Sequence, residues 1–105
     1  MTPEEAAKRK EEWVAKMKRE GKMKEDMTED HKSCLNALQN PVRRNILKFL
    51  NGQQKSFEEI KMVLKLTDTQ ARYNLNMLEG TLCIEREESD GVTYYFLTPR
   101  GEGYV

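Results

Sequence analysis

The sequence Ser56-Phe57-Glu58-Glu59 is followed, after a short apolar stretch, by Thr67-Asp68-Thr69-Gln70. Each quartet has the form of a capping box. The Ser or Thr hydroxyl accepts a hydrogen bond from the amide three residues on, and the Glu or Gln side chain accepts one from the Ser or Thr amide. Because a capping box marks the start of a helix, two so close together predict two short helices joined by a tight turn. That arrangement is a helix-turn-helix.

Both predicted helices have one apolar face. After the first box the helical spacing collects Phe57, Ile60, Leu64 and Leu66, and after the second it collects Ala71, Leu75 and Leu78. We expect the second helix to run from Asp68 to Glu79. Its outward side then carries groups that can donate, accept or stack, whereas an ordinary solvated face carries mainly Lys and Glu. These outward residues are Thr69, Arg72, Tyr73 and Asn76.

Length and composition narrow the class of protein. The 105 residues are 34% charged and 37% hydrophobic, with a mean hydropathy of −0.86, which suits one domain with an appendage. No apolar run approaches the roughly 20 residues that cross a bilayer, and the first residues lack the basic and apolar regions of a secretory signal. We expect a cytoplasmic protein without a membrane span. Cys34 and Cys83 lie in apolar runs, which favours reduced core thiols over a disulfide.

The formal net charge is +0, but the charges are unevenly spread. Residues 33–84 hold seven Lys or Arg against four Asp or Glu, and residues 85–105 hold two against five. Such a separation lets one face attract phosphate while another repels it. Ordinary scatter of surface charge explains the same counts equally well.

Residues 1–30 read as an amphipathic helix and a charged linker. Thr2-Pro3-Glu4-Glu5 predicts a helix start, and Gly21 ends the helix after Glu20. The apolar stripe of Ala6, Trp13 and Met17 is too thin to form a core alone. This helix therefore docks on the main domain, pairs with a second copy or frays. Residues 22–26 form the linker.

Residues 31–105 read as the main domain. Thr28 or Asp30 caps a helix carrying Cys34, and Asn40-Pro41 starts another that runs from Val42 to Leu50. After the two capped helices, residues 82–87 and 92–98 read as strands around a turn at 89–91. Pro99 then ends the strand, and we expect no helix after it. The order predicts a mainly α fold with a small β-hairpin, a winged helix-turn-helix preceded by an extra N-terminal helix.

Three stretches resemble the winged-helix regulators of the arsenical-resistance-repressor (ArsR-like) type. The run from Ala37 to Leu47 is similar to the entry motif of that family, the run from Leu66 to Leu75 to its turn and recognition helix, and the run from Tyr94 to Thr98 to its second wing strand. The similarity covers residues 31 to 100. Three motifs in the right order are a specific signal.

The resemblance implies a DNA-binding transcriptional regulator that inserts the helix at about 68–79 in the major groove of double-stranded DNA as a homodimer. Arg72 suits guanine or phosphate, and Gln70 or Asn76 suits adenine. Lys and Arg side chains near this helix supply backbone contacts. The candidate DNA-binding residues are Thr67, Thr69, Gln70, Arg72, Tyr73, Asn76, Lys61, Lys65 and Arg43.

Two departures keep a second hypothesis open. The wing tip at 85–91 is acidic and would be repelled by phosphate, and without a C-terminal helix the dimer contact falls to the N-terminal helix. The alternative is a protein-protein interaction module that uses its acidic wing, with Tyr94 and Phe96, against a protein partner. The sequence offers no catalytic set of residues, so we expect no enzyme. We also expect no cofactor and no metal, because His31 and Cys34 alone are poor evidence for a metal site.

Overall fold

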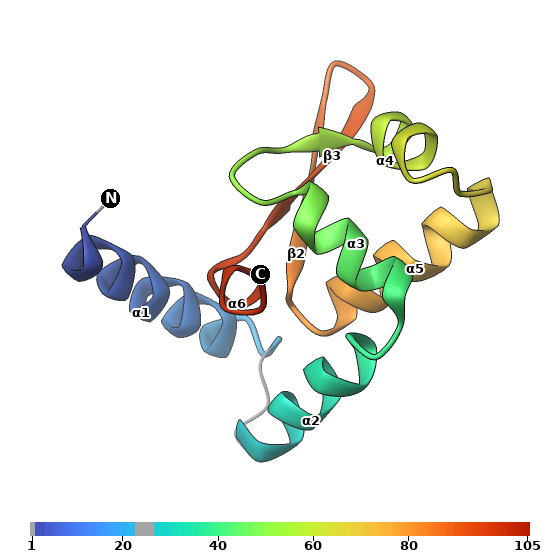
Figure 1. The fold of residues 1–105 in the computed structure, drawn as a ribbon. Helices are drawn as coiled ribbons and strands as arrows, with labels where there is room; N and C mark the ends of the chain where they lie inside the picture. The colour runs from blue at the N-terminus through green and yellow to red at the C-terminus, as the bar shows by residue number, and fades with distance from the viewer. Residues whose placement is uncertain (1, 23–26) are drawn as a thin grey trace.

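A computed structural model describes residues 2–22 and 27–105, with side chains for 2–22 and 32–105. The described helices and strands are α1 (Pro3–Arg19), α2 (Met27–Ala37), α3 (Pro41–Phe49), β1 (Lys55–Ser56), α4 (Phe57–Val63), α5 (Asp68–Gly80), β2 (Ile84–Ser89), β3 (Val92–Leu97) and α6 (Pro99–Glu102). Helices α4 and α5 form the helix-turn-helix, and the β2–β3 hairpin is the wing (Figure 1). The predicted fold class, a mainly α winged helix-turn-helix preceded by an extra helix, is confirmed.

The helices begin at the predicted capping residues. The Ser56 hydroxyl accepts from the Glu59 amide at 3.1 Å, and the Glu59 carboxylate accepts from the Ser56 amide at 3.2 Å. Thr67 and Gln70 form the same pair of bonds, at 3.1 and 3.0 Å, at the start of α5. These bonds satisfy amides that have no partner within the helix. The predicted caps of α1 and α3, Thr2 and Asn40, are also observed.

The sheet has the strand order β1-β3-β2, and both pairings are antiparallel. The wing turns at Asp90 and Gly91, whose φ angles of 52° and 78° are the two positive values of a type I′ turn. The predicted hairpin is therefore confirmed. Its first strand begins at Ile84 instead of Leu82, because Leu82 has a φ of 63°, which no strand residue adopts. The two-residue strand β1 was not predicted.

The core lies between α2, α3, α4, α5 and the inner face of the sheet. Alternation along β3 buries Tyr95 and Leu97. Each fully buried large apolar side chain contributes about 1.5–3 kcal/mol relative to its exposed state. The buried cluster consists of Cys34, Ile46, Leu47, Leu50, Ile60, Leu75, Leu78, Cys83, Ile84, Tyr95 and Leu97.

Helix α6 contradicts the expectation that nothing helical follows Thr98. Thr98 caps this helix by accepting from the Gly101 amide at 3.1 Å. Gly101 is required because a Cβ there would lie 2.0 Å from the Cys83 carbonyl oxygen. The prediction was wrong because Pro99 was interpreted only as the end of a strand, whereas Thr followed by Pro is also a favourable helix start.

Helix α2 also starts differently from the prediction. It begins at Met27, so neither Thr28 nor Asp30 precedes it as a cap. The predicted charged linker at 22–26 lies, apart from Lys22, outside the described residues. Within the described ranges, no helix combines the length and the apolar character needed to cross a bilayer.

Helix α1 docks on its own chain, which is one of its three predicted fates. It lies beside α6 (Figure 1). The Arg9 guanidinium donates to both carboxylate oxygens of Glu102, at 2.7 and 3.0 Å. The Trp13 indole Nε1 donates to the Glu85 carboxylate at 3.0 Å, and Met17 is only 2% exposed. The division of the chain into 1–30 and 31–105 stays a prediction.

The docking of α1 can be followed through Trp13, the single tryptophan of the chain. We predict that Glu85→Ala lowers the free energy of unfolding monitored by Trp13 fluorescence by about 1 kcal/mol, because the indole loses a charged acceptor that is partly exposed. The emission of the folded variant should move to longer wavelength. Glu87→Ala, on the same strand, is the control and should match the wild type. Equal effects of the two substitutions would contradict the docking contact.

Candidate nucleic-acid interface

Helix α5 is divided into a buried and an exposed face. Ala71, Leu75 and Leu78 are 0% exposed and pack into the core. Because these residues fix the rotation of α5 about its axis, the opposite side faces solvent. Tyr73 is 58% exposed there. The structure brings the predicted outward residues together on this one face, and all are exposed: Thr69, Arg72, Tyr73 and Asn76. The candidate Gln70 is exposed beside them.

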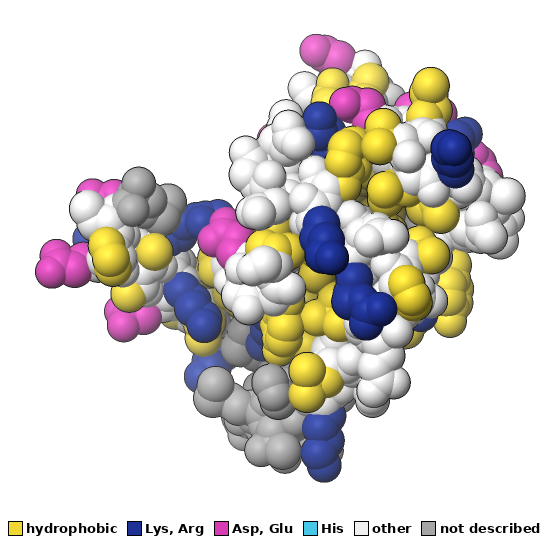
Figure 2. Space-filling view, in the orientation of Figure 1, with side chains coloured by type: hydrophobic (Ala, Val, Ile, Leu, Met, Phe, Trp, Pro, Cys, Tyr) yellow, Lys and Arg dark blue, Asp and Glu magenta, His cyan; other side chains and the backbone are white. Residues whose placement is uncertain are grey.

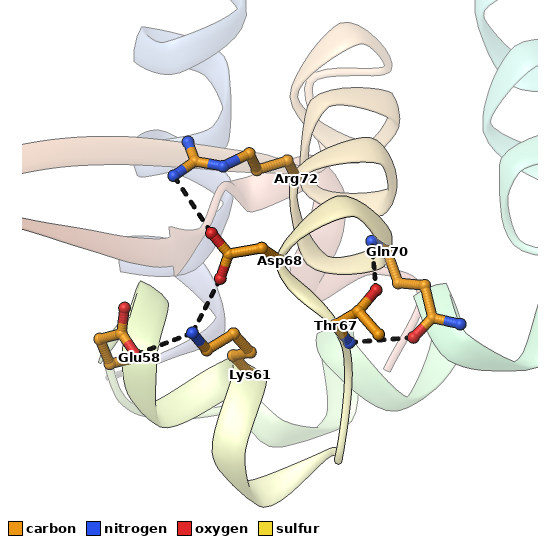
Figure 3. Close-up of polar contacts among 6 residues, drawn as sticks. All are labelled: Glu58, Lys61, Thr67, Asp68, Gln70 and Arg72. Carbon is orange, nitrogen blue, oxygen red and sulfur yellow. Dashed lines mark hydrogen bonds and ion pairs between the residues drawn. The ribbon is translucent and has the colours of Figure 1, made fainter.

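The capping box limits what Gln70 can offer a ligand. Its carbonyl oxygen accepts from the Thr67 amide at 3.0 Å, and its NH₂ group points away from that bond (Figure 3). Bidentate recognition of adenine needs both the carbonyl oxygen and the NH₂ group. Because the capping bond occupies one lone pair and fixes the direction of the oxygen, the NH₂ group is the part of Gln70 best placed for a ligand, as a donor to a guanine edge or a phosphate. Asn76 is the remaining candidate for adenine.

An ion-pair cluster lies at the start of α5. Asp68 accepts from the Lys61 ammonium at 2.8 Å and lies 3.7 Å from the Arg72 guanidinium. Lys61 also pairs with Glu58 at 3.2 Å (Figure 3). The hydrogen bond to Asp68 is the main reason that the pKa of Lys61 is raised, and the same bond lowers the pKa of Asp68. Two candidate phosphate-binding cations are thus partly neutralised by carboxylates of the same chain.

The remaining cations near α5 differ in how tightly they are held. The Arg72 guanidinium lies over the Phe57 ring, 5.0 Å from its centroid, yet its side chain remains 67% exposed. Lys65 is exposed in the turn between α4 and α5, where its φ of 55° places it in the left-handed region. Both side chains can therefore reach a ligand that approaches the N-terminal half of α5.

Arg43 does not occupy the position predicted for it. It is 9% exposed, its Nε donates to the Asn74 side-chain oxygen at 3.0 Å, and a terminal nitrogen donates to the Ala37 carbonyl at 3.1 Å. Arg43 is buried because it lies on the apolar face of α3. Its spacing from Ile46, Leu47 and Leu50 is i, i+3, i+4 and i+7, and residues at that spacing share one helical face. Asn74 shares the buried face of α5 in the same way and was missed as a candidate. Arg43 is an internal residue of the interface, not a surface contact.

The wing remains acidic in the folded chain. Glu85 binds Trp13, and Arg86 lies 3.6 Å from Glu79 of α5. The tip residues Glu87, Glu88 and Asp90 are exposed. Figure 2 shows Lys and Arg side chains as separate patches among apolar and neutral groups on the face in view, so they form no continuous basic strip there.

A curated relative places the chain in a family. No family model matches the chain. An uncharacterised protein of Archaeoglobus fulgidus is 38% identical over 65 residues, which are 60% of this chain and 70% of that protein. The chain belongs to the same family as this archaeal protein.

Solved structures identify the fold of this family member. A possible transcriptional regulatory protein of Mycobacterium bovis has a TM-score of 0.67 at 24% identity, covering 78% of this chain and 86% of that one. HlyU from Vibrio cholerae has a TM-score of 0.68 at 20% identity, covering 75% and 86%. A second structure of the same M. bovis fragment, the homodimeric winged helix-turn-helix DNA-binding domain of Mb0332, has a TM-score of 0.67 at 24% identity, covering 74% and 70%. These likenesses show the ArsR-like winged-helix fold.

The two cysteines of this winged-helix chain are buried thiols in contact. Their sulfur atoms are 4.0 Å apart, and the Cys83 thiol donates to Cys34. This hydrogen bond lowers the pKa of Cys34 to about 6 against the opposing effect of burial, and it raises the pKa of Cys83. The His31 side chain lies outside the described side chains, so its pairing with Cys34 is untested. Among the side chains that are described, no three His, Cys, Asp or Glu gather closely enough to hold a metal ion.

Glu79 links α5 to the wing through its ion pair with Arg86, but its carboxylate lies in an unfavourable environment. One carboxylate oxygen is buried and has no hydrogen-bond partner among the described residues. Burial raises the pKa of Glu79 above 4.5, and Arg86 only partly opposes this. An acid whose pKa rises on folding stabilises the fold when protonated, and this stability is lost as the pH rises through the raised pKa.

We predict that Glu79→Gln stabilises the fold at neutral pH by less than about 1 kcal/mol, because Gln does not ionise. The gain is modest because 26% of the Glu79 side chain is exposed and Arg86 offsets part of the penalty. Urea unfolding at several pH values should show the difference from wild type shrinking as the pH falls through the raised pKa of Glu79 and vanishing well below 4.5, where Glu79 is protonated in both the folded and the unfolded chain. Glu88→Gln, on the exposed wing, is the control. A variant less stable than wild type at pH 7 would show that the ion pair with Arg86 dominates.

Proposed function

We propose that this protein is a DNA-binding transcriptional regulator that inserts α5 in the major groove of duplex DNA as a homodimer. The observation that carries the proposal is the exposed polar row of α5, held outward by a fully buried opposite face. An α-helix fits the width of the major groove. Occupancy of an operator by such a dimer would hinder or recruit polymerase.

The exposed row divides into groups for base edges and groups for the DNA backbone. Arg72 can bind the O6 and N7 atoms of guanine, Asn76 can bind adenine with both ends of its amide, and Tyr73 can contact a thymine methyl group. Thr69, Thr67 and Gln70 lie at the N-terminal end of α5, where hydroxyl and amide donors suit phosphate. Lys61 and Lys65 add backbone contacts from α4 and the turn.

The local charge supports contact with DNA around α4, the turn and α5, and not at the wing. Residues 33–84 carry the excess of Lys and Arg, whereas the wing carries the excess of carboxylates. Because phosphate repels carboxylates, the wing tip would be turned away from the duplex. Lys61 must exchange Asp68 for a phosphate when DNA binds, which weakens non-specific binding.

The homodimer is proposed partly from likeness and partly from geometry. The Mb0332 domain is described as homodimeric, and two recognition helices are needed for tight binding to paired half-sites. Trp13 and Met17 of α1 already contact their own chain. A dimer through α1 would therefore use its outward side or exchange α1 between two copies. Sedimentation equilibrium of the full chain and of a truncated chain that begins near Thr28 tests this role, and an equal mass for both would remove it.

The acidic wing favours a second candidate function. Glu87, Glu88 and Asp90 are exposed together at the tip, and such a group suits a basic protein surface. On this hypothesis the winged helix is a protein-protein interaction module, and α5 has no DNA ligand. Absence of binding to any duplex at low salt would favour this candidate.

We predict that Arg72→Ala weakens binding to a duplex selected from a randomised pool by about tenfold, as expected for loss of one bidentate guanine contact. If Arg72 instead binds phosphate, the slope of log K against log salt falls by about 1 and random duplex is weakened equally. Fluorescence anisotropy at several salt concentrations measures both quantities. Arg19→Ala, an exposed arginine of α1, is the control. Equal affinities of the wild type and both variants would contradict the role of Arg72.

We predict that Asp68→Asn strengthens binding to random duplex at low salt by about threefold to tenfold, because it releases Lys61 and Arg72 for phosphate. The salt dependence should become steeper for the same reason. Glu11→Gln on α1 removes the same charge far along the sequence from α5 and controls for the change in net charge. If the two variants gain affinity equally, the cluster at Asp68 does not limit DNA binding.

A further inference from the structure

Arg43 and Asn74 are each placed against the local preference of their helix. Arg43 is the third residue of α3, where the helix dipole disfavours a cation, and the first turn of α3 has no acidic residue. Asn74 is 6% exposed in the middle of α5, where Asn is a poor helix former. Neither residue is explained by the stability of its own helix. Two residues that oppose the preference of their helices meet in one contact, Arg43 to Asn74. Such exceptions are expected at functional positions, which points to a role for this contact in supporting the exposed face of α5.

The two residues meet in a bridge between three helices. We use the name Arg43 bridge for Arg43, the Ala37 carbonyl, Asn74 and Tyr73. Ala37 ends α2, so its carbonyl is one of those without a partner in the helix, and Arg43 donates to it at 3.1 Å. Arg43 Nε donates to Asn74 at 3.0 Å, and Asn74 in turn donates to the Gln70 carbonyl at 2.8 Å. The bridge therefore joins the end of α2 to the centre of α5.

The same guanidinium reaches the exposed row. It lies 5.9 Å from the centroid of the Tyr73 ring, which is within range of a cation–π contact. Tyr73 is nonetheless 58% exposed. One face of the ring is thus supported from inside the protein while much of the ring remains available to a ligand. Asn74, the next residue, anchors the backbone of α5 beneath it.

We propose that Arg43 is a positioning residue for sequence readout: through the Arg43 bridge it anchors the centre of α5, whose rotation the core residues set, and it orients Tyr73 against base edges. The proposal rests on the proposed DNA-binding function. Base-edge hydrogen bonds require the reading side chains to be held within fractions of an ångström. Phosphate contacts made by long, flexible Lys side chains do not require such accurate positioning. Loosening the bridge therefore harms sequence-specific binding and spares non-specific binding.

Arg43→Lys separates this role from a phosphate contact, because Lys keeps the charge but cannot hold the Ala37 carbonyl and Asn74 with a planar fork. We expect affinity for a duplex selected by the wild-type protein to fall about tenfold, as for loss of one buried charged hydrogen bond. Affinity for random duplex and the slope of log K against log salt should be unchanged. Arg44→Lys is the matched control, because Arg44 is exposed and donates to the Leu38 carbonyl at 3.1 Å. It should behave as the wild type.

Asn74→Ala tests the bridge from the α5 side. Ala is the best helix former, so this variant keeps α5 folded, and far-ultraviolet circular dichroism verifies it. If Arg43 and Asn74 act through one bridge, the double variant Arg43→Lys with Asn74→Ala should lose no more sequence specificity than either single variant. Additive losses would overturn the proposal, as would a reduced salt slope in Arg43→Lys or unchanged discrimination between the selected and random duplexes.

A measurement without DNA distinguishes failure of the bridge from failure of the proposed function. The measurement compares NMR spectra of the free proteins. Relative to the wild type, the side-chain NH₂ signals of Asn74 should shift in Arg43→Lys and stay in place in Arg44→Lys. If these signals behave as expected but the wild type binds neither duplex, the DNA-binding function fails and the readout role fails with it. If they do not respond to Arg43→Lys, the bridge itself is wrong whatever the protein binds.

Discussion

The burial of one face of α5 determines what the rest of the molecule can do. Ala71, Leu75 and Leu78 have no solvent exposure. Because of the helical repeat, the side chains on the opposite side of α5 then face solvent. The Thr67 capping box fixes where the helix begins, and α4 holds its N-terminal end through the Lys61–Asp68 ion pair. A recognition surface on a rigid helix depends on two conditions: the core must hold the helix in place, and the helix must present the ligand-binding side chains.

Electrostatics act against tight non-specific binding by this surface. The chain has zero net charge, and two cations at the start of α5, Lys61 and Arg72, are paired with carboxylates of the same chain. The wing adds exposed carboxylates on the β2–β3 hairpin. In most nucleic-acid-binding proteins a broad basic surface supplies much of the affinity. Here, on the proposed function, a larger share must come from base contacts and from dimerisation, which makes accurate positioning of α5 more important.

Much of the fold could be predicted because its signals are local. Capping boxes, the Asn40-Pro41 helix start and the turn at Asp90 each depend on a few neighbouring residues, and the structure has all of them. The two-residue strand β1 could not be predicted, since it exists only because Lys55 and Ser56 pair with distant Tyr95 and Tyr94. Helix α6 had a local signal, Thr98 followed by Pro99, but it was given the wrong meaning.

The candidate site was only partly predictable for a related reason. The outward row of α5 follows from periodicity, and every member is exposed. The same periodicity places Arg43 and Asn74 on buried faces, but Arg43 was predicted to lie at the surface because of its residue type, and Asn74 was not considered. That two polar side chains would satisfy each other across α3 and α5 depends on the three-dimensional approach of those helices. No spacing along the chain encodes that approach.

The central claim is that the exposed side of α5 is where a duplex binds. The most direct test is to follow backbone amide signals of the isotope-labelled, full-length protein by NMR while a short duplex is added at low salt. The account predicts that the largest changes fall at residues 65–76, covering the turn and the first half of α5, with α1 unaffected. Changes confined to the wing or to α1, with α5 signals in place, would contradict it.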